Sequence, residues 1–201
     1  MTNWCTYRIK VVGKKENIQK FEDWLNAGYT YCGNNISPNM EESVKNMQKA
    51  GWNHYAKRGH HLYSNSDKHF FRVDSVHEEK TVEVKGDGKI AKYLHGVCAW
   101  SVYSCMMPGT YTYYFDAISG VHGELALEHA TNLLLASEEL GLDIEVYSKE
   151  PGVGFAEHYL IKQGELEIDD ETEYRCQWDE DPVSGEEEIV EFGGFNEAWH
   201  I

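Results

Sequence analysis

Long apolar runs and proline are scarce in this chain. The longest purely apolar stretch is about four residues, far below the ~20 that a membrane-spanning helix needs. The first residues, Met1 to Cys5, lack the basic and apolar regions of a secretion signal. Only 4 Pro and 18 Gly are present, which excludes collagenous and low-complexity segments. We therefore expect a soluble cytoplasmic protein with no membrane partner.

Recognisable catalytic and metal-binding motifs are also absent. The five cysteines, at 5, 32, 98, 105 and 176, are odd in number and form no CxxC pair, so free thiols are expected. There is no GxSxG motif for a nucleophilic serine and no HExxH motif for zinc. Ser101, Ser104, Cys98 and Cys105 lie near His95, but packing is the favoured interpretation. The sequence predicts no catalytic residue, no cofactor and no bound metal.

Acidic residues outnumber basic ones, and they are unevenly distributed. The 201-residue chain has 18 Lys+Arg and 34 Asp+Glu, a net charge of −16. Residues 141–201 hold 3 basic and 18 acidic side chains, which leaves 15 and 16 for residues 1–140, so nearly all of the excess lies in the last third. Direct binding to nucleic acid is not expected, because phosphate contacts need clustered cations. The acidic surface either keeps the protein soluble or imitates nucleic-acid phosphates on a partner's basic groove.

Hydrophobic periodicity predicts a mixture of strands and helices. Aromatic residues make up 13% of the chain, enough for a packed core. Alternation, turn residues and apolar content predict strands at 4–13, 69–76, 80–85, 96–106, 143–148, 154–162, 165–176 and 188–192, with 89–95 either strand or short helix. Helical spacing predicts helices around 18–25, 41–50 and 125–140. Residues 29–40 and 51–69 are expected to be loops.

This order of elements predicts one α+β domain over residues 1–201. An antiparallel sheet with helices packed on one face is the simplest arrangement. Residues 29–69 form an irregular insertion in this scheme, and residues 179–201 form an acidic C-terminal extension.

Three short stretches resemble one protein family. They are Asn3-Trp4-Cys5, Cys98-Ala99-Trp100-Ser101 and the run from Glu150 to Ala156, Glu-Pro-Gly-Val-Gly-Phe-Ala. Together they resemble the YubB ferredoxin-like family of bacterial, plasmid and phage proteins, over the start of the chain and roughly residues 96–178. The resemblance implies a ferredoxin-like sheet and a phage or mobile-element setting in a bacterial host cell. It implies no catalytic residues.

Candidate ligand-binding residues gather in two parts of the sequence. Residues 52–72 form the one basic stretch interleaved with aromatic residues, suited to phosphates and stacked bases. The run after Glu150 could close a glycine-rich rim on a ligand, although a tight turn or bulge between strands is the favoured interpretation. The predicted ligand-binding residues are Trp52, Tyr55, Lys57, Arg58, His61, Arg72, Trp100, Glu150, Phe155 and Tyr159.

Three functional hypotheses follow. The first is a non-catalytic counter-defence protein that sequesters a small nucleotide-type immune signal. A homo-oligomer of this protein would be compatible with that role. The second is an acidic inhibitor that mimics nucleic acid and binds a host defence or nucleic-acid-handling protein. The third is a metal-dependent hydrolase that uses some of the ten histidines. We prefer the first hypothesis, with a nucleotide-like ligand or a host protein as partner.

Overall fold

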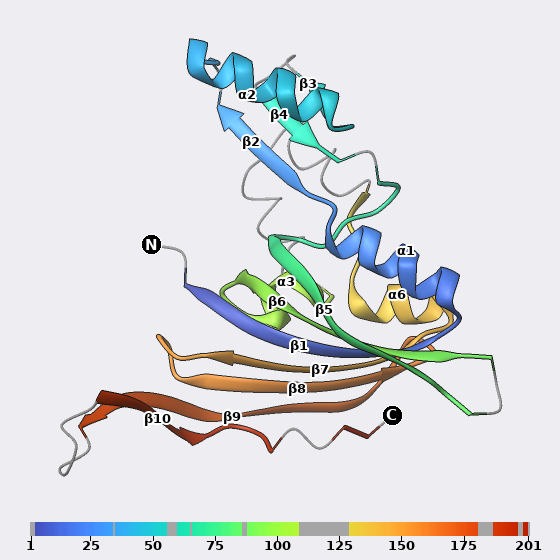
Figure 1. Ribbon diagram of the computed structural model, residues 1–201, viewed down its shortest axis with the longest axis vertical. Helices are drawn as coiled ribbons and strands as arrows, with labels where there is room; N and C mark the ends of the chain where they lie inside the picture. Colours follow the sequence, from blue (N-terminus) through green and yellow to red (C-terminus); the bar gives the residue numbers. More distant parts are fainter. Residues whose placement is uncertain are drawn as a thin grey trace.

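The computed structural model is a mixed α+β structure built on two antiparallel sheets (Figure 1). It describes residues 3–33, 35–55, 60–64, 66–85, 88–108, 129–180, 187–196 and 199–200. Within this part of the chain, no helix is long and apolar enough to cross a membrane.

The larger sheet has seven strands in the order β10-β9-β8-β7-β1-β6-β5. Every neighbouring pair is antiparallel, and the sheet is visibly curled (Figure 1). The strands are β1 (Trp4–Gly13), β5 (Val73–Glu83), β6 (Ile90–Ala99), β7 (Asp143–Glu150), β8 (Phe155–Lys162), β9 (Glu165–Glu180) and β10 (Glu187–Gly193).

Helices cover one face of this sheet. They are α1 (Lys15–Leu25), α6 (Leu133–Leu140) and the short α3 (Val102–Met106). The apolar residues of α1 recur at helical spacing, and α1 joins α6 through a hydrogen bond from Asn17 to the carbonyl of Leu140 (2.6 Å). The core between these helices and the sheet includes Cys5, Tyr7, Ile9, Phe21, Trp24, Leu94, Val146 and Ile161. We call this side of the sheet the covered face.

Alternation along β1 separates the covered face from the opposite one. Cys5, Tyr7 and Ile9 are buried under the helices, whereas Trp4 and Arg8 alternate with them and are exposed. Side chains paired with Arg8 and Lys10 in register therefore also lie on the opposite side, which we call the open face.

The smaller sheet has three strands in the order β2-β4-β3. Its strands are β2 (Tyr29–Gly33), β3 (Asn53–Tyr55) and β4 (His60–Tyr63), and helix α2 (Pro38–Lys49) belongs to the same lobe. This lobe projects away from the large sheet (Figure 1). The loops predicted at 29–40 and 51–69 are therefore wrong where these elements form. The apolar pattern of each strand is too short to distinguish it from a loop.

Two predicted elements end differently in the structure. The strand predicted at 96–106 stops at Ala99, because Trp100 adopts φ = 70° and Ser101 then caps α3. The helix predicted at 125–140 is interrupted in the described residues: Ala130 pairs with His69 in a β-bridge, and α6 begins at Leu133, where Asn132 caps it. Residues 125–128 lie outside the described part.

The strands predicted at 69–76 and 80–85 are in fact one strand. β5 runs from Val73 to Glu83, and it absorbs two register shifts against β6. Residues 69–72 precede it as irregular chain, in which Arg72 has φ = 50°. The helix around 18–25, the first strand and the hairpin that turns at Gln163-Gly164 are confirmed.

Candidate functional site

The open face carries a groove of about 820 Å³. Strands β1, β5, β6, β7, β9 and β10 contribute to it, so the curl of the sheet forms its floor. We call it the open-face groove. Its lining includes Trp4, Thr6, Arg8, His77, Glu79, His95, Tyr147, Lys149, Tyr174, Ile189 and Glu191.

Two salt bridges set the charge of the groove. Arg8 donates two hydrogen bonds to Glu79, at 2.9 and 2.7 Å, and these bonds lower the pKa of Glu79 below its ordinary value. Lys149 contacts Glu191 at 2.9 Å and lowers the pKa of that carboxyl as well. Two cations and two carboxylates therefore balance here, in a chain with a net charge of −16.

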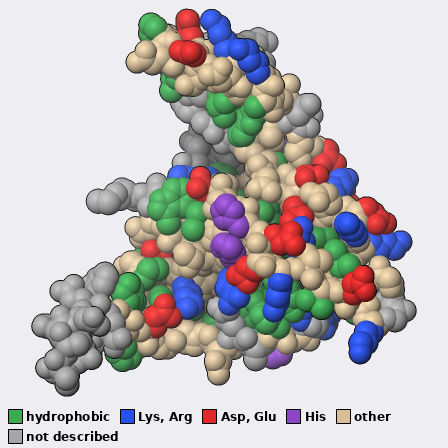
Figure 2. Space-filling view, in the orientation of Figure 1, with side chains coloured by type: hydrophobic (Ala, Val, Ile, Leu, Met, Phe, Trp, Pro, Cys, Tyr) green, Lys and Arg blue, Asp and Glu red, His purple; other side chains and the backbone are tan. Residues whose placement is uncertain are grey.

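Histidine and exposed apolar groups complete the groove. The rings of His77 and His95 lie 5.4 Å apart, and His95 approaches Glu79 at 3.5 Å. Trp4 is 48% exposed and Ile189 is 55% exposed. Figure 2 shows histidine, basic, acidic and hydrophobic side chains interspersed over the large sheet. Such a surface offers both a flat apolar contact and hydrogen-bond donors to one ligand.

A buried polar cluster adjoins the groove through Tyr147. Glu145 on β7 is fully buried, and its Oε1 lies 3.1 Å from Nε2 of His158 on β8. The backbone N–H of His200 donates to its Oε2 at 2.6 Å. Tyr147 stacks on His158 with ring centroids 4.1 Å apart. Glu145, His158 and His200 each offer a metal-ligand atom, and these atoms lie within 4.8 Å of one another.

The structure separates the residues predicted from the basic-aromatic stretch. Trp52 lies in the small lobe, where its ring packs over Gly28. It lines a pocket of about 580 Å³ together with Lys20 and Trp24. Lys57 and Arg58 lie outside the described residues, and only the backbones of Tyr55 and His61 are described, on β3 and β4.

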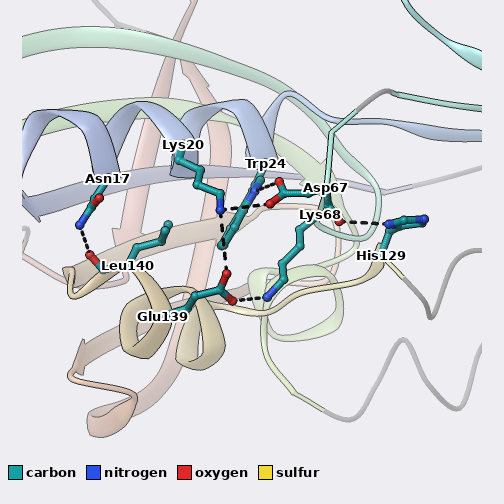
Figure 3. Close-up of polar contacts among 8 residues, drawn as sticks. All are labelled: Asn17, Lys20, Trp24, Asp67, Lys68, His129, Glu139 and Leu140. Atoms are coloured by element: carbon teal, nitrogen blue, oxygen red, sulfur yellow. Dashed lines mark hydrogen bonds and ion pairs between the residues drawn. The ribbon is translucent and has the colours of Figure 1, made fainter.

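Next to the Trp52 pocket, a polar network connects three segments of the chain (Figure 3). Asp67 accepts a hydrogen bond from the indole N–H of Trp24 at 2.7 Å and forms an ion pair with Lys20 at 3.1 Å. Lys68 contacts Glu139 of α6. These contacts hold the chain that leaves the small lobe against α1 and α6, so they explain the polar residues here as structural.

Arg72 and Trp100 are brought together, although 28 positions separate their numbers in the sequence. The guanidinium of Arg72 lies 4.6 Å from the centroid of the Trp100 ring, a cation–π contact. Trp100 also packs against Phe71, with ring centroids 6.2 Å apart. Neither Arg72 nor Trp100 lines the open-face groove.

The predicted rim after Glu150 folds on itself. The Glu150 carboxylate accepts a hydrogen bond from the backbone N–H of Val153, so it stabilises the turn. Tyr159 is buried and donates to Glu157 at 3.1 Å. Phe155 begins β8 and is half-buried. The tight-turn interpretation explains Glu150, and Tyr159 belongs to the covered face.

Glu157 shows how completely the covered face uses its polar groups. Its carboxylate accepts from the backbone N–H groups of Val102 and Tyr103, at 2.9 and 3.0 Å. Ser148 and Tyr159 donate to it at 2.6 and 3.1 Å. Burial raises the pKa of Glu157, and these four hydrogen bonds oppose that shift. The buried carboxylate therefore anchors the start of α3.

The cysteines and serines near His95 in the sequence have structural environments. Cys98 and Cys105 are buried in the core. Hydrogen bonds with Cys105 and Cys5, together with burial, raise the pKa of the Cys98 thiol well above its ordinary value. A nucleophilic cysteine needs the opposite shift, because its thiolate is the reactive form. Ser101 caps α3.

Sequence reasoning missed the residues of the open face. Trp4 and Arg8 come from β1 and Lys149 comes from the distant strand β7, and each alternates with buried residues along its strand. One signal was available for the buried cluster. Glu145 lies between Ile144 and Val146, and His158 directly precedes the run Tyr159-Leu160-Ile161, positions where a titratable side chain is unusual.

Comparisons of this chain with protein-family models, with curated proteins and with solved structures find no match.

Proposed function

We propose that this protein is a non-catalytic binding protein that sequesters a small nucleotide-type ligand in its open-face groove. The observation that carries the proposal is the combination in one groove of an exposed tryptophan with an arginine and a lysine. Trp4, Arg8 and Lys149 all line it. Sequestration needs contacts with a ligand and no reaction, which fits a groove without an activated nucleophile among its described residues.

The chemistry of a nucleotide matches these three side chains. The half-exposed indole of Trp4 offers a face for a base, and stacking of this kind tolerates any base. Arg8 and Lys149 offer donors to phosphate oxygens. Their present partners are carboxylates at the surface, and exposed pairs contribute only about 0–1 kcal/mol. A phosphate would compete with Glu79 and Glu191 for these two cations.

The order of strands supports the ferredoxin-like part of the proposal. The central strands run β7-β1-β6-β5, with α1 following β1 and α6 preceding β7 on the same face. A β-α-β-β-α-β unit of the ferredoxin-like kind has this arrangement. The other strands then extend one edge of that unit. The proposed setting, a phage or mobile-element protein that acts against host defence in the bacterial cytoplasm, rests on the resemblance to the YubB family.

Calorimetry with a panel of cyclic and linear nucleotides tests the proposal on untagged protein. We expect at least one nucleotide to bind. Trp4→Ala should weaken that binding by about 5- to 150-fold, the equivalent of one lost stacking contact. Trp52→Ala, in the small lobe, is the matched control and should leave the affinity unchanged.

Two outcomes would contradict this assignment. If no nucleotide in the panel produces heat, the protein is not a nucleotide sponge. If Trp52→Ala abolishes binding while Trp4→Ala does not, the ligand binds in the small lobe, as the basic-aromatic stretch predicted.

A row of carboxylates on β9 favours the acidic inhibitor as a second candidate. Asp169, Glu171 and Glu173 are exposed and alternate along the strand, so they share one face at a spacing of about 7 Å. Arg175 contacts Glu173 at 3.4 Å. A regular row of negative charges suits a partner whose groove is lined with cations.

Charge reversal tests this second candidate. Wild-type protein on a column should retain a nucleic-acid-handling protein from bacterial lysate, and duplex DNA should compete for it. Replacing Asp169, Glu171 and Glu173 by Lys should abolish that retention. Equal retention of the partner by the triple variant would refute the mimicry.

A further inference from the structure

Three potential metal ligands converge on the open face of the large sheet, beside the open-face groove. Glu145 and His158 come from neighbouring strands, β7 and β8, and His200 comes from the segment that follows β10. Glu145 and His158 are buried, whereas His200 is exposed. Residues that are 55 positions apart in the sequence, Glu145 and His200, meet here through a hydrogen bond at the backbone of His200.

The surroundings of this cluster are aromatic. Tyr147 stacks on one side of His158, and Phe195 lies 5.5 Å from the His158 ring. Trp199 contacts Tyr147, with ring centroids 5.0 Å apart. An apolar wall of this kind excludes water and strengthens the attraction between a carboxylate and a cation.

We propose that Glu145, His158 and His200 bind one divalent transition-metal ion, with Zn²⁺ the preferred ion. Two imidazole nitrogens and one carboxylate oxygen are a ligand set that zinc accepts, whereas Mg²⁺ and Ca²⁺ prefer oxygen ligands throughout. The proposal is independent of the nucleotide-binding proposal, because no residue of the set lines the open-face groove.

The geometry requires only a small adjustment. The three ligand atoms lie within 4.8 Å of one another. In a tetrahedral zinc site with bonds of about 2.1 Å, ligand atoms are about 3.4 Å apart. His200 is exposed, so its ring can move toward the two buried ligands at little cost.

Three protein ligands leave one zinc position open. In zinc sites with three protein ligands, water or a substrate atom takes the fourth position. Tyr147 lies between this cluster and the groove and lines the groove itself. Because Tyr147 is buried and stacked on His158, it closes the groove side of the site.

Lys10 is a positive charge that would compete with a bound metal ion. It lies opposite Glu145 in register on β1 and is buried on the same face. Its ammonium group stabilises the Glu145 carboxylate without metal and repels a cation. Lys10→Met should therefore tighten metal binding, whereas removal of a metal ligand should weaken it.

The test uses full-length, untagged protein that has been treated with chelator and dialysed. Zn²⁺ binding is measured by calorimetry, the metal content by elemental analysis, and the ligand geometry by the visible absorption of Co²⁺. We expect one ion per chain. His200→Ala should weaken Zn²⁺ binding by more than about 100-fold, beyond the usual effect of an outer-shell change.

His95→Ala is the matched control. His95 is a half-exposed histidine on the same face, paired with His77 at 5.4 Å, and its loss should leave the Zn²⁺ affinity unchanged. Circular dichroism checks that each variant is folded, and the exposed position of His200 makes its variant the safer one. Glu145→Gln, which replaces a buried group, is interpreted only if it folds.

Three outcomes would overturn the proposal. They are the absence of stoichiometric binding, equal affinity for Zn²⁺ in wild type and His200→Ala, and loss of binding on replacement of His95. The first would mean that Glu145, His158 and Lys10 form a closed polar network without metal. A failure of nucleotide binding with intact Zn²⁺ binding would refute the proposed function and leave the metal site standing.

Discussion

The two faces of the seven-stranded sheet use their polar residues in different ways. On the covered face, Glu157 receives four hydrogen bonds from neighbouring groups of the protein, and Tyr7 donates to the carbonyl of Ser75 at 2.7 Å. On the open face, Arg8 and Lys149 form ion pairs at the edge of a groove. Glu157 and Tyr7 therefore stabilise the fold on the covered side, while Arg8 and Lys149 keep partly exposed ion pairs on the other.

Replacing Glu157 should have the largest effect on stability. Glu157→Ala removes the acceptor of two backbone N–H groups and two hydroxyls, all in or near the core. We expect a loss of about 3–5 kcal/mol in the free energy of unfolding, as for other broken buried charge networks. Urea denaturation followed by circular dichroism measures it.

Glu171 provides the matched control for Glu157. It lies opposite Glu157 in the β8–β9 register but is exposed. Glu171→Ala should change the free energy of unfolding by no more than about 0.5 kcal/mol. Similar losses for both variants would contradict the distinction between buried, fully bonded carboxylates and exposed ones.

Acid should lower the free energy of unfolding through protonation of the buried His69. Burial lowers the pKa of His69 from 6.5 to about 4, so the unfolded chain binds a proton that the folded chain rejects. The stability that neutral His69 contributes is complete above pH 6.5 and is lost as the pH falls toward 4. A shift of this size corresponds to roughly 3 kcal/mol.

The variant His69→Gln isolates this contribution, because glutamine does not titrate. Denaturation curves at pH 7 and pH 4.5 should differ less for the variant than for the wild type. An equal loss of stability in both proteins would assign the acid sensitivity to other groups.

Only a small effect on stability is expected for Arg8. Its ion pair with Glu79 is bidentate, but the Arg8 side chain is 44% exposed. We expect Arg8→Ala to lower the free energy of unfolding by at most about 1 kcal/mol. The same variant should reduce nucleotide affinity in the calorimetric panel. A large loss of stability would place Arg8 among the structural residues and weaken the comparison of the two faces.

Much of the secondary structure could be predicted from the sequence, because local patterns encode it. Strand β1 has strict alternation, α1 has apolar residues at helical spacing, and Gln163-Gly164 mark a hairpin. The α+β class and the antiparallel sheet with helices on one face follow from the order of these elements. The strands of the small lobe escaped prediction because three to five residues are too few to show a period.

The position of the candidate site could not be predicted in the same way. Clustering in sequence favoured residues 52–72, but Trp52 and Arg72 lie in different places, and the described part of that stretch does not form one site. The groove instead collects residues from six strands of the large sheet. No local pattern marks them, because each alternates with core residues that dominate the signal of its strand.

The sequence by itself determined most of the elements of the large sheet, the class of fold and the concentration of negative charge after residue 140, since these depend on neighbours along the chain. Only the tertiary structure decided which face stays open and which side chains meet on it. Antiparallel pairing places Arg8 beside Tyr147 and Lys10 beside Glu145, and the segment after β10 brings His200 to them. Those contacts depend on strand order and register. Sequences with the same local patterns could adopt a different strand order or register, and different side chains would then meet.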